Sequence, residues 1–275
     1  MIYVTPRGGF GNGLFQIAAL YAHALDNNDN LCLLNTKKHI NDLNNDVRAT
    51  AKNGDAYNYI FERFDRIDNV KIEWKPNQQY NVPTENNSFS KVRYPFQHVP
   101  LKYQKEYEYI GYFQCEKNFI HRRDEILELL KPVNEFLDTI NKYSDLFGSI
   151  GLHVRRGDYV KEHAGRYVFL GMDYYNKALS ELPKDIPVLV FSDGIEWCKK
   201  NFIGDRFVFI DESDYICLYI MAKMKYFIIA NSSFSWWGTW LGEPEKVFAP
   251  KEWFGNDVKH KPYEYDIIPD GWKKF

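Results

Sequence analysis

Two adjacent arginines, Arg155 and Arg156, follow an apolar run in the middle of the chain. The run Ile-Gly-Leu-His-Val, which ends with His153 and a valine, is typical of a buried strand, and Asp158 lies just beyond the arginines. Ligands of open α/β sheets bind outside the carboxyl ends of the strands. Two permanent cations at such an end suit a pyrophosphate better than they suit a protein core. The alternative interpretation is a surface pair of arginines that form salt bridges with acids.

Two further strand ends carry small polar groups. Ser192 and Asp193 follow one apolar run, where Asp193 would either cap the next helix or accept a hydrogen bond from a nucleobase or ribose. Ser232 and Ser233 follow another run and stand at the start of a predicted helix, where backbone N–H groups favour an anion. Three strand ends thus indicate one anionic ligand with hydrogen-bonding rings, and a sugar nucleotide or a dinucleotide fits best.

A glycine-rich segment, residues 8–13, lies between a short apolar run and a helical pattern. Phosphate-binding loops occur in this context, because glycines let backbone N–H groups approach an anion. The dinucleotide fingerprint Gly-x-Gly-x-x-Gly would require a glycine at the position of Leu14, and no Walker lysine is present. The segment is therefore compatible with a tight structural turn and with a ligand loop.

Repeated strand and helix patterns surround these residues. Strands are predicted at 2–5, 31–34, 107–114, 150–155, 188–191, 207–210, 227–230 and 247–249. Helices are predicted at 14–25, 118–130, 133–143, 173–182, 195–202, 213–225 and 234–241, the last with Trp236 and Trp240 in the core. Such repeats indicate an α/β protein with mostly parallel sheets and helices on both faces. We predict two Rossmann-like domains, residues 1–145 and 146–275, and irregular loops at 36–56 and 75–100.

The composition is that of a globular protein, with 275 residues, 45% of them hydrophobic and 26% charged. A net charge of −2 gives no general attraction to nucleic acid or to an anionic membrane. No apolar run has the length of a membrane span or of a signal-peptide core, which predicts a soluble, cytoplasmic protein. The four cysteines read as buried thiols, although an even number also allows disulfides, and no metal-ligand motif is present.

Five segments together resemble the α-1,2-fucosyltransferases of glycosyltransferase family 11. In family order they are Gly-Gly-Phe-Gly-Asn-Gly-Leu-Phe-Gln at 8–16, Tyr-Ile-Gly-Tyr-Phe-Gln at 109–114, His-Val-Arg-Arg-Gly-Asp at 153–158, Ser-Asp-Gly-Ile-Glu-Trp-Cys at 192–198 and Asn-Ser-Ser-Phe-Ser-Trp-Trp at 231–237. They span nearly the whole chain, and the third and fifth together are highly specific. The chain departs from the family pattern at Gly13, where glutamine is usual, and at Gly194, where a second aspartate is usual.

The resemblance implies a GT-B fold, in which two Rossmann-like domains face a central cleft, with the acceptor on the N-terminal side and the donor on the C-terminal side. It implies GDP-fucose as donor, a galactose-terminated glycan as acceptor, inversion at the anomeric carbon, and no metal or other cofactor. Arg155 would hold the pyrophosphate, and His153 and Asn12 would lie against the nucleotide or its phosphates. The other implied donor contacts are Arg156, Ser192, Asp193 on the guanine or ribose side, and Ser232, Ser233 and Phe234 around the phosphates.

Inversion requires a single displacement, in which an acceptor hydroxyl attacks C1 of fucose while GDP leaves. Arg155, with the helix N-terminus at Ser232, is the expected electrostatic catalyst. Asp158 is the candidate base, and its alternative roles are to orient Arg156 or to cap a helix. Two rival functions are a transferase of the same fold with another donor or linkage, and a non-catalytic protein that binds a nucleotide sugar or a glycan. Gly13 and Gly194 keep the second rival open.

Overall fold

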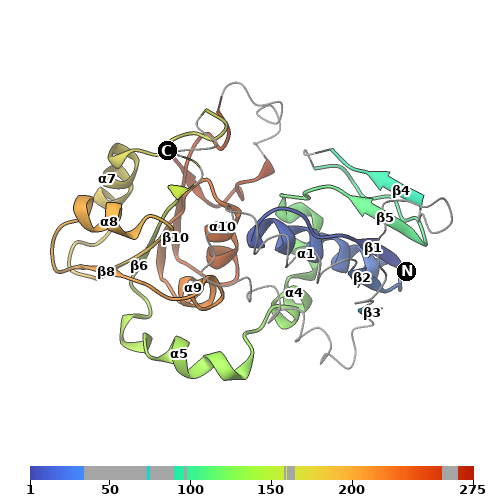
Figure 1. Ribbon diagram of the computed structural model, residues 1–275, viewed down its shortest axis with the longest axis horizontal. Coiled ribbons are helices and arrows are strands. Elements are labelled where there is room, and N and C mark those ends of the chain that lie inside the picture. The colour runs from blue at the N-terminus through green and yellow to red at the C-terminus, as the bar shows by residue number, and fades with distance from the viewer. Residues whose placement is uncertain (34–72, 75–89, 96–97, 158, 160–164, 256–265) are drawn as a thin grey trace. The chain divides into compact units, whose positions relative to one another are not determined.

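A computed structural model describes residues 1–33, 73–74, 90–95, 98–157, 159, 165–255 and 266–275. The chain forms two compact units that divide between Val133 and Asn134 (Figure 1). We call them the N-terminal unit and the C-terminal unit. The predicted irregular loop at 36–56 and most of the one at 75–100 lie outside the described residues.

The division falls before the position at 145 that the sequence suggested, because the short helices after Asn134 pack on the C-terminal unit. These helices are η3 Asn134–Phe136, α5 Leu137–Asn141 and η4 Ser144–Leu146. The Phe136 ring lies 5.2 Å from that of Tyr215, and the Tyr143 hydroxyl donates a hydrogen bond of 2.7 Å to Glu212. Local helical periodicity carries no information about the partner on which a helix packs.

The N-terminal unit is built on a parallel sheet with the order β3-β2-β1-β5-β4. Its strands are β1 Ile2–Val4, β2 Leu31–Leu33, β3 Glu73–Trp74, β4 Ser90–Arg93 and β5 Tyr107–Ile110. Helix α1, Phe10–Asp26, follows β1 and is buried along most of its length. The predicted helix at 118–130 consists of 3₁₀ turns η1 Glu116–Asn118 and η2 Ile120–Arg122, followed by α4 Arg123–Leu129.

The C-terminal unit contains a parallel sheet with the order β11-β10-β9-β6-β7-β8. Its strands are β6 Ile150–Val154, β7 Val188–Ser192, β8 Phe207–Phe209, β9 Tyr226–Ile228, β10 Lys246–Ala249 and β11 Lys273–Lys274. Its longer helices are α7 Met172–Ser180, α8 Ile195–Asn201, α9 Asp214–Met221 and α10 Ser233–Trp240. Taken from β6, the strand order is that of a doubly wound Rossmann sheet, and its direction reverses between β6 and β9.

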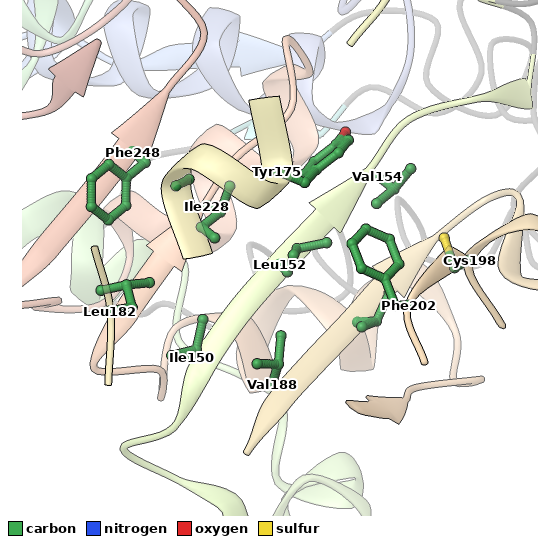
Figure 2. Packing of buried hydrophobic residues seen from close by; sticks show 12 residues of the cluster. Ile150, Leu152, Val154, Tyr175, Leu182, Val188, Cys198, Phe202, Ile228 and Phe248 are labelled. Carbon is green, nitrogen blue, oxygen red and sulfur yellow. The ribbon is translucent and has the colours of Figure 1, made fainter. Parts of the chain in front are cut away.

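Strand β6 is buried on both faces, which is what its continuous apolar sequence predicts. Ile150, Leu152 and Val154 face a core that includes Tyr175 of α7 and Cys198 of α8 (Figure 2). The alternate residues face the other side, where His153 contacts a ring of α10. A Cβ atom on Gly151 would lie 2.2 Å from the Phe227 ring, so this strand needs a glycine there. Helices on both faces therefore hold β6, and with it the segment that follows.

Two other expectations from the sequence, on the cysteines and on the tryptophans, are also confirmed. The four cysteines are free and buried. Trp236 and Trp240 are both buried, and their rings stack 5.9 Å apart. Among the described helices, none is long and apolar enough to cross a membrane.

Candidate functional site

The three strand ends singled out in the sequence lie side by side in the C-terminal unit. Strand β6 lies between β9 and β7, and Val154 pairs with Ser192 across the last step of the β6–β7 ladder. The carboxyl ends of β6 and β9 flank the point where the strand order reverses, and ligands of doubly wound sheets bind there. The three strand ends that the sequence suggested share a ligand are thus neighbours in one sheet.

Asp193 binds both arginine residues after β6. Its Oδ2 lies 3.0 Å from Nη1 of Arg155, and its Oδ1 accepts a hydrogen bond of 2.7 Å from the backbone N–H of Arg156. The predicted capping role of Asp193 is wrong, because Gly194 is the N-cap of α8 and no side chain caps that helix. The structure shows that Asp193 forms an ion pair with Arg155. Its predicted contact with guanine or ribose stays a prediction.

Two small residues make this arrangement possible. The Ser192 hydroxyl donates a hydrogen bond of 2.7 Å to Val154 O and accepts one of 2.9 Å from the N–H of Gly194, which joins the ends of β6 and β7. A Cβ atom on Gly157 would lie 2.5 Å from Oδ2 of Asp193. The carboxylate thus packs directly on the backbone of the arginine loop.

The two arginines have different surroundings. The Arg156 guanidinium lies 4.1 Å from the ring centre of Trp197 and 5.3 Å from that of Phe169, so it stacks on aromatic groups. A Cβ atom on Gly194 would lie 3.1 Å from Cβ of Arg156. A side chain at 194 would therefore press on that of Arg156, which would have to move by a few tenths of an ångström. Arg155 is the cation that pairs with a carboxylate at the strand end.

His153 lies beneath this surface and is 3% exposed. Its ring meets that of Phe234 edge-on at 5.7 Å, and its Nδ1 has no hydrogen-bond partner among the described residues. Burial, and to a lesser degree the charge of Arg155, lowers the pKa of His153 to about 3. The imidazole is therefore neutral near pH 7, and its contact with the nucleotide stays a prediction.

The first turn of α10 contains the predicted serine cluster. Ser232 is the N-cap residue and is buried, and its carbonyl accepts a hydrogen bond of 3.1 Å from the N–H of Trp236. Ser233 and Phe234 are half-buried in the same turn. The helix dipole places partial positive charge at this end. Arg155 and the start of α10 thus lie at the ends of adjacent strands, which suits a dianionic ligand.

Asn231 is a polar residue of this region that the sequence did not single out as a site residue. Its buried side-chain amide donates hydrogen bonds of 2.9 Å to both Val168 O and Trp253 O. Its own carbonyl accepts a hydrogen bond of 2.9 Å from the Tyr159 hydroxyl. Asn231 directly precedes the two predicted site serines, so its position in the sequence pointed to this region. Its hydrogen-bond partners are distant in sequence and could not be predicted from it.

Asp214, at the start of α9, is a second such residue. Burial raises the pKa of its carboxyl group, Arg155 lowers it, and Asp193 raises it further. Ser213 caps this helix by accepting a hydrogen bond from Ile216 N–H. The sequence predicted a helix that begins at 213, and the structure also places the Asp214 carboxylate within the electrostatic reach of Arg155.

In the N-terminal unit, side chains fasten the glycine-rich segment as a tight turn. Gly8 has φ +80°, and a Cβ atom there would lie 2.6 Å from Nδ2 of Asn12. Gln16 binds both the N–H and the carbonyl of Arg7, and Gln114 donates a hydrogen bond of 2.6 Å to Oδ1 of Asn12. The turn is thus a rigid structure at the ends of β1 and β5, and the contact of Asn12 with a nucleotide stays a prediction.

The candidate base, Asp158, lies outside the described residues. Within the ranges that the structure covers, no group of three His, Cys, Asp or Glu side chains is placed to hold a metal ion.

The comparisons with known proteins agree with this architecture. A family model described as Glycosyl transferase family 11 matches residues 1–273. An alpha-1,2-colitosyltransferase of Escherichia coli is 29% identical over 99% of this chain and 98% of its own length. The O-antigen biosynthesis glycosyltransferase WbnK of the same species is 28% identical over 98% of this chain and 99% of its own. Galactoside alpha-(1,2)-fucosyltransferase 2 of Oryctolagus cuniculus is 28% identical, over 61% of this chain and 52% of its own.

Among solved structures, the fucosyltransferase NodZ from Bradyrhizobium superposes with a TM-score of 0.53 at 14% identity, over 88% of this chain and 92% of that one. A structure of NodZ alpha-1,6-fucosyltransferase soaked with GDP-fucose gives a TM-score of 0.52 at 15% identity, with the same coverage of 88% and 92%. At this identity the likeness shows the fold alone, and it confirms the predicted α/β architecture of the GT-B type. The chain is thus a glycosyltransferase that belongs to glycosyl transferase family 11.

Proposed function

We propose that the protein transfers L-fucose from GDP-fucose to the 2-hydroxyl of a terminal β-galactoside, with inversion at the anomeric carbon. The observation that carries this proposal is the Arg155 guanidinium, paired with Asp193 at 3.0 Å, at the end of β6 next to the strand that leads into α10. A guanidinium and a helix N-terminus are two groups that bind diphosphates well. The names of two relatives support the α-1,2 linkage.

In the proposed reaction, the acceptor oxygen forms a bond to C1 of fucose as the bond from C1 to the β-phosphate oxygen breaks. The acceptor proton passes to a base, and the electron pair of the broken bond leaves with GDP. The charge that develops on the diphosphate lies against Arg155 and the first turn of α10, which are in place before the reaction starts. Because these groups supply positive charge, we propose that transfer needs no divalent metal.

Asp158 remains our proposal for the base, because it belongs to the same loop as Arg155. Replacement by asparagine removes the proton acceptor but keeps the shape of the side chain. We expect the acidic limb of the pH profile of kcat/KM to disappear in Asp158→Asn. An unchanged limb with a uniformly lower rate would instead assign Asp158 to the support of the arginine loop.

A second candidate donor is GDP-colitose, because a full-length relative is named an alpha-1,2-colitosyltransferase. Colitose is fucose without the 3-hydroxyl group. A site that hydrogen-bonds this hydroxyl discriminates strongly against the sugar that lacks it. A site that leaves the hydroxyl in solvent accepts both donors, so the ratio of the two rates shows whether the site recognises the 3-hydroxyl group.

The test is to incubate the purified protein with GDP-fucose, GDP-colitose and UDP-sugars on an array of β-galactosides, with and without EDTA. We expect a product with fucose α-1,2-linked to galactose, formed equally well with EDTA. Arg155→Lys should lower turnover by about a hundred- to a thousandfold, because an ammonium cannot replace the bidentate guanidinium. Arg206→Lys is the matched control, since Arg206 donates to Pro183 O at the surface. Donor binding without transfer to any acceptor would favour a non-catalytic protein.

A further inference from the structure

Tyr159 lies next to Arg155 and also contacts Tyr167 and Asn231. Its ring centre is 5.4 Å from the Arg155 guanidinium carbon. Its ring stacks on that of Tyr167 with centres 4.1 Å apart and planes within 3° of parallel. Its hydroxyl donates a hydrogen bond of 2.9 Å to the carbonyl of Asn231. One side chain thus touches the proposed catalytic arginine, a supporting ring and the strand end that leads into α10.

The support beneath Tyr159 is itself fixed. Tyr167 forms an antiparallel bridge with Phe254, and the N–H of Gly255 donates to Arg166 O at 2.9 Å. The buried Asn231 amide holds the same two segments through its hydrogen bonds of 2.9 Å to Val168 O and Trp253 O. The Tyr167 ring and the Asn231 carbonyl, both of which Tyr159 contacts, therefore belong to segments that are held together by hydrogen bonds.

Arg155 has a carboxylate partner at 3.0 Å in Asp193 and an aromatic neighbour in Tyr159. Each interaction restricts the guanidinium, and the two together restrict both its position and its plane. A guanidinium that is already oriented loses less entropy when it binds a diphosphate, and it stabilises the departing charge without rearrangement.

We propose that Tyr159 is a positioning residue for Arg155, which couples the orientation of the guanidinium to the strand end at Asn231. The inference rests on the proposed function, because it assumes that Arg155 binds the diphosphate of the donor. It adds a residue whose part in transfer neither the sequence pattern nor the family relationship assigned.

Two variants separate the contributions of the ring and the hydroxyl. Tyr159→Phe keeps the ring but loses the bond to Asn231 O, and we expect kcat to fall by about fivefold to tenfold. Tyr159→Leu loses both contacts, and we expect a loss of about a hundredfold, mostly in kcat, with a smaller change in KM for the donor. In an Arg155→Lys background, Tyr159→Leu should add little, because the two residues act as one unit.

Tyr174→Phe is the matched control. The Tyr174 hydroxyl donates a hydrogen bond of 2.7 Å to Ile229 O, so the variant loses a tyrosine–carbonyl bond to the same chain segment two residues earlier. Tyr174 packs against the core on the other face of the sheet. We expect Tyr174→Phe to lower Tm by about as much as Tyr159→Phe, by a few degrees, and to leave kcat unchanged.

GDP binding by calorimetry distinguishes the two ways in which the inference can fail. If the unmodified protein binds GDP and transfers the sugar, and Tyr159→Leu matches Tyr174→Phe in kcat, the positioning role is wrong and the proposed function stands. If the unmodified protein neither binds GDP nor transfers a sugar from a GDP donor, the proposed function is wrong and the role of Tyr159 falls with it. A loss of kcat confined to the Tyr159 variants, in proteins that unfold cooperatively, supports the inference.

Discussion

A single carboxylate, that of Asp193, contacts both arginines of the strand-end loop. It forms an ion pair with the Arg155 side chain and accepts a hydrogen bond from the Arg156 backbone. The backbone of Gly157 packs against the same carboxylate. The geometry of the proposed diphosphate site is therefore set by interactions within the protein before any ligand arrives.

Asp193→Asn tests this dependence. The amide oxygen still accepts the bond from Arg156 N–H, but the charge that holds Arg155 is lost. We expect turnover to fall by about tenfold to a hundredfold, because Arg155 is then less well oriented. Steady-state kinetics with GDP-fucose measure the effect. Asp173→Asn, a change in the first turn of α7, serves as the control and should have normal turnover. Equal rates for the two variants would contradict the role of Asp193.

The buried His153 makes the stability of the protein depend on pH. Its folded-state pKa is about 3, below the ordinary value of 6.5, so the unfolded chain takes up a proton that the folded chain rejects. Stability is therefore lost as pH falls below 6.5, by up to about 1.4 kcal/mol per pH unit. Burial also lowers the pKa of His23, which contributes in the same direction.

Urea denaturation of wild type and His153→Phe at pH 6.5 and at about pH 5 isolates this contribution, because the carboxylates are common to both proteins. The variant should lose less free energy of unfolding on acidification than the wild type does. If wild type and His153→Phe have the same pH dependence, His153 is not the buried neutral group described above.

At the scale of elements, close contact between α9 and α10 fixes two of the polar residues near Arg155. The N-terminal ends of these helices contain Asp214 and Ser233, respectively. A Cβ atom on Gly238 would lie 2.7 Å from Cβ of Met221, so a side chain there would force the helices apart. The close approach of α9 and α10, and with it the relative position of their N-terminal ends, thus depends on Gly238.

Gly238→Ala should destabilise the protein by about 1–3 kcal/mol, the usual range for an overpacked core. Denaturant unfolding measures this, and turnover at low temperature shows whether the helix ends have moved. A Cβ atom on Gly271 would meet nothing within 4 Å, so Gly271→Ala is the control and should change stability by less than about 0.5 kcal/mol. Comparable stability of the two alanine variants would contradict close helix packing.

Apolar strands were predictable from the sequence, whereas polar edge strands were not. The buried strand β6 has an unbroken apolar sequence, and its predicted end differs from the observed one by a single residue. Strand β4, Ser-Lys-Val-Arg, falls in a segment that reads as an irregular loop, because it is a largely exposed edge strand with polar side chains. Its strand conformation comes from pairing with β5, which local composition does not encode.

The candidate site shows the same contrast. The sequence predicted that Arg155 lies at a strand end, because strand and loop are adjacent in the chain. It did not predict the bond from Tyr159 to Asn231, or the contact of the Asn231 amide with Trp253, because these partners come together only when the sheet forms. Contacts between distant segments are thus the part of the site that needed the structure.

At the scale of the molecule, the residues assigned to the donor belong mainly to the C-terminal unit. Only Asn12 among them lies in the N-terminal unit. A Rossmann-like unit with the strand-end site at its switch point contains the main elements of a nucleotide site by itself. We therefore expect ligand effects to be concentrated in this unit.

Hydrogen exchange in the presence of GDP tests this expectation. At about one hundred times its dissociation constant, GDP should stabilise the folded protein by about 2.7 kcal/mol. Amide exchange should slow at 153–157, 192–195 and 231–236, and should be unchanged at β11. Arg155→Ala should abolish the slowing. Protection confined to the N-terminal unit would contradict the location of the site.

The packing of indole rings behind the first turn of α10 has a practical consequence. Trp236 lies 5.2 Å from Trp237, 5.9 Å from Trp240 and 5.7 Å from Trp272, and its Nε1 donates a hydrogen bond of 2.7 Å to Ile267 O. Indole rings this close are coupled in their electronic excitations. The cluster therefore contributes to the circular dichroism spectrum as one chromophore. An anion that arrives at the start of the helix changes the electric field on that chromophore. We therefore expect donor binding to change the near-ultraviolet circular dichroism of the unlabelled protein.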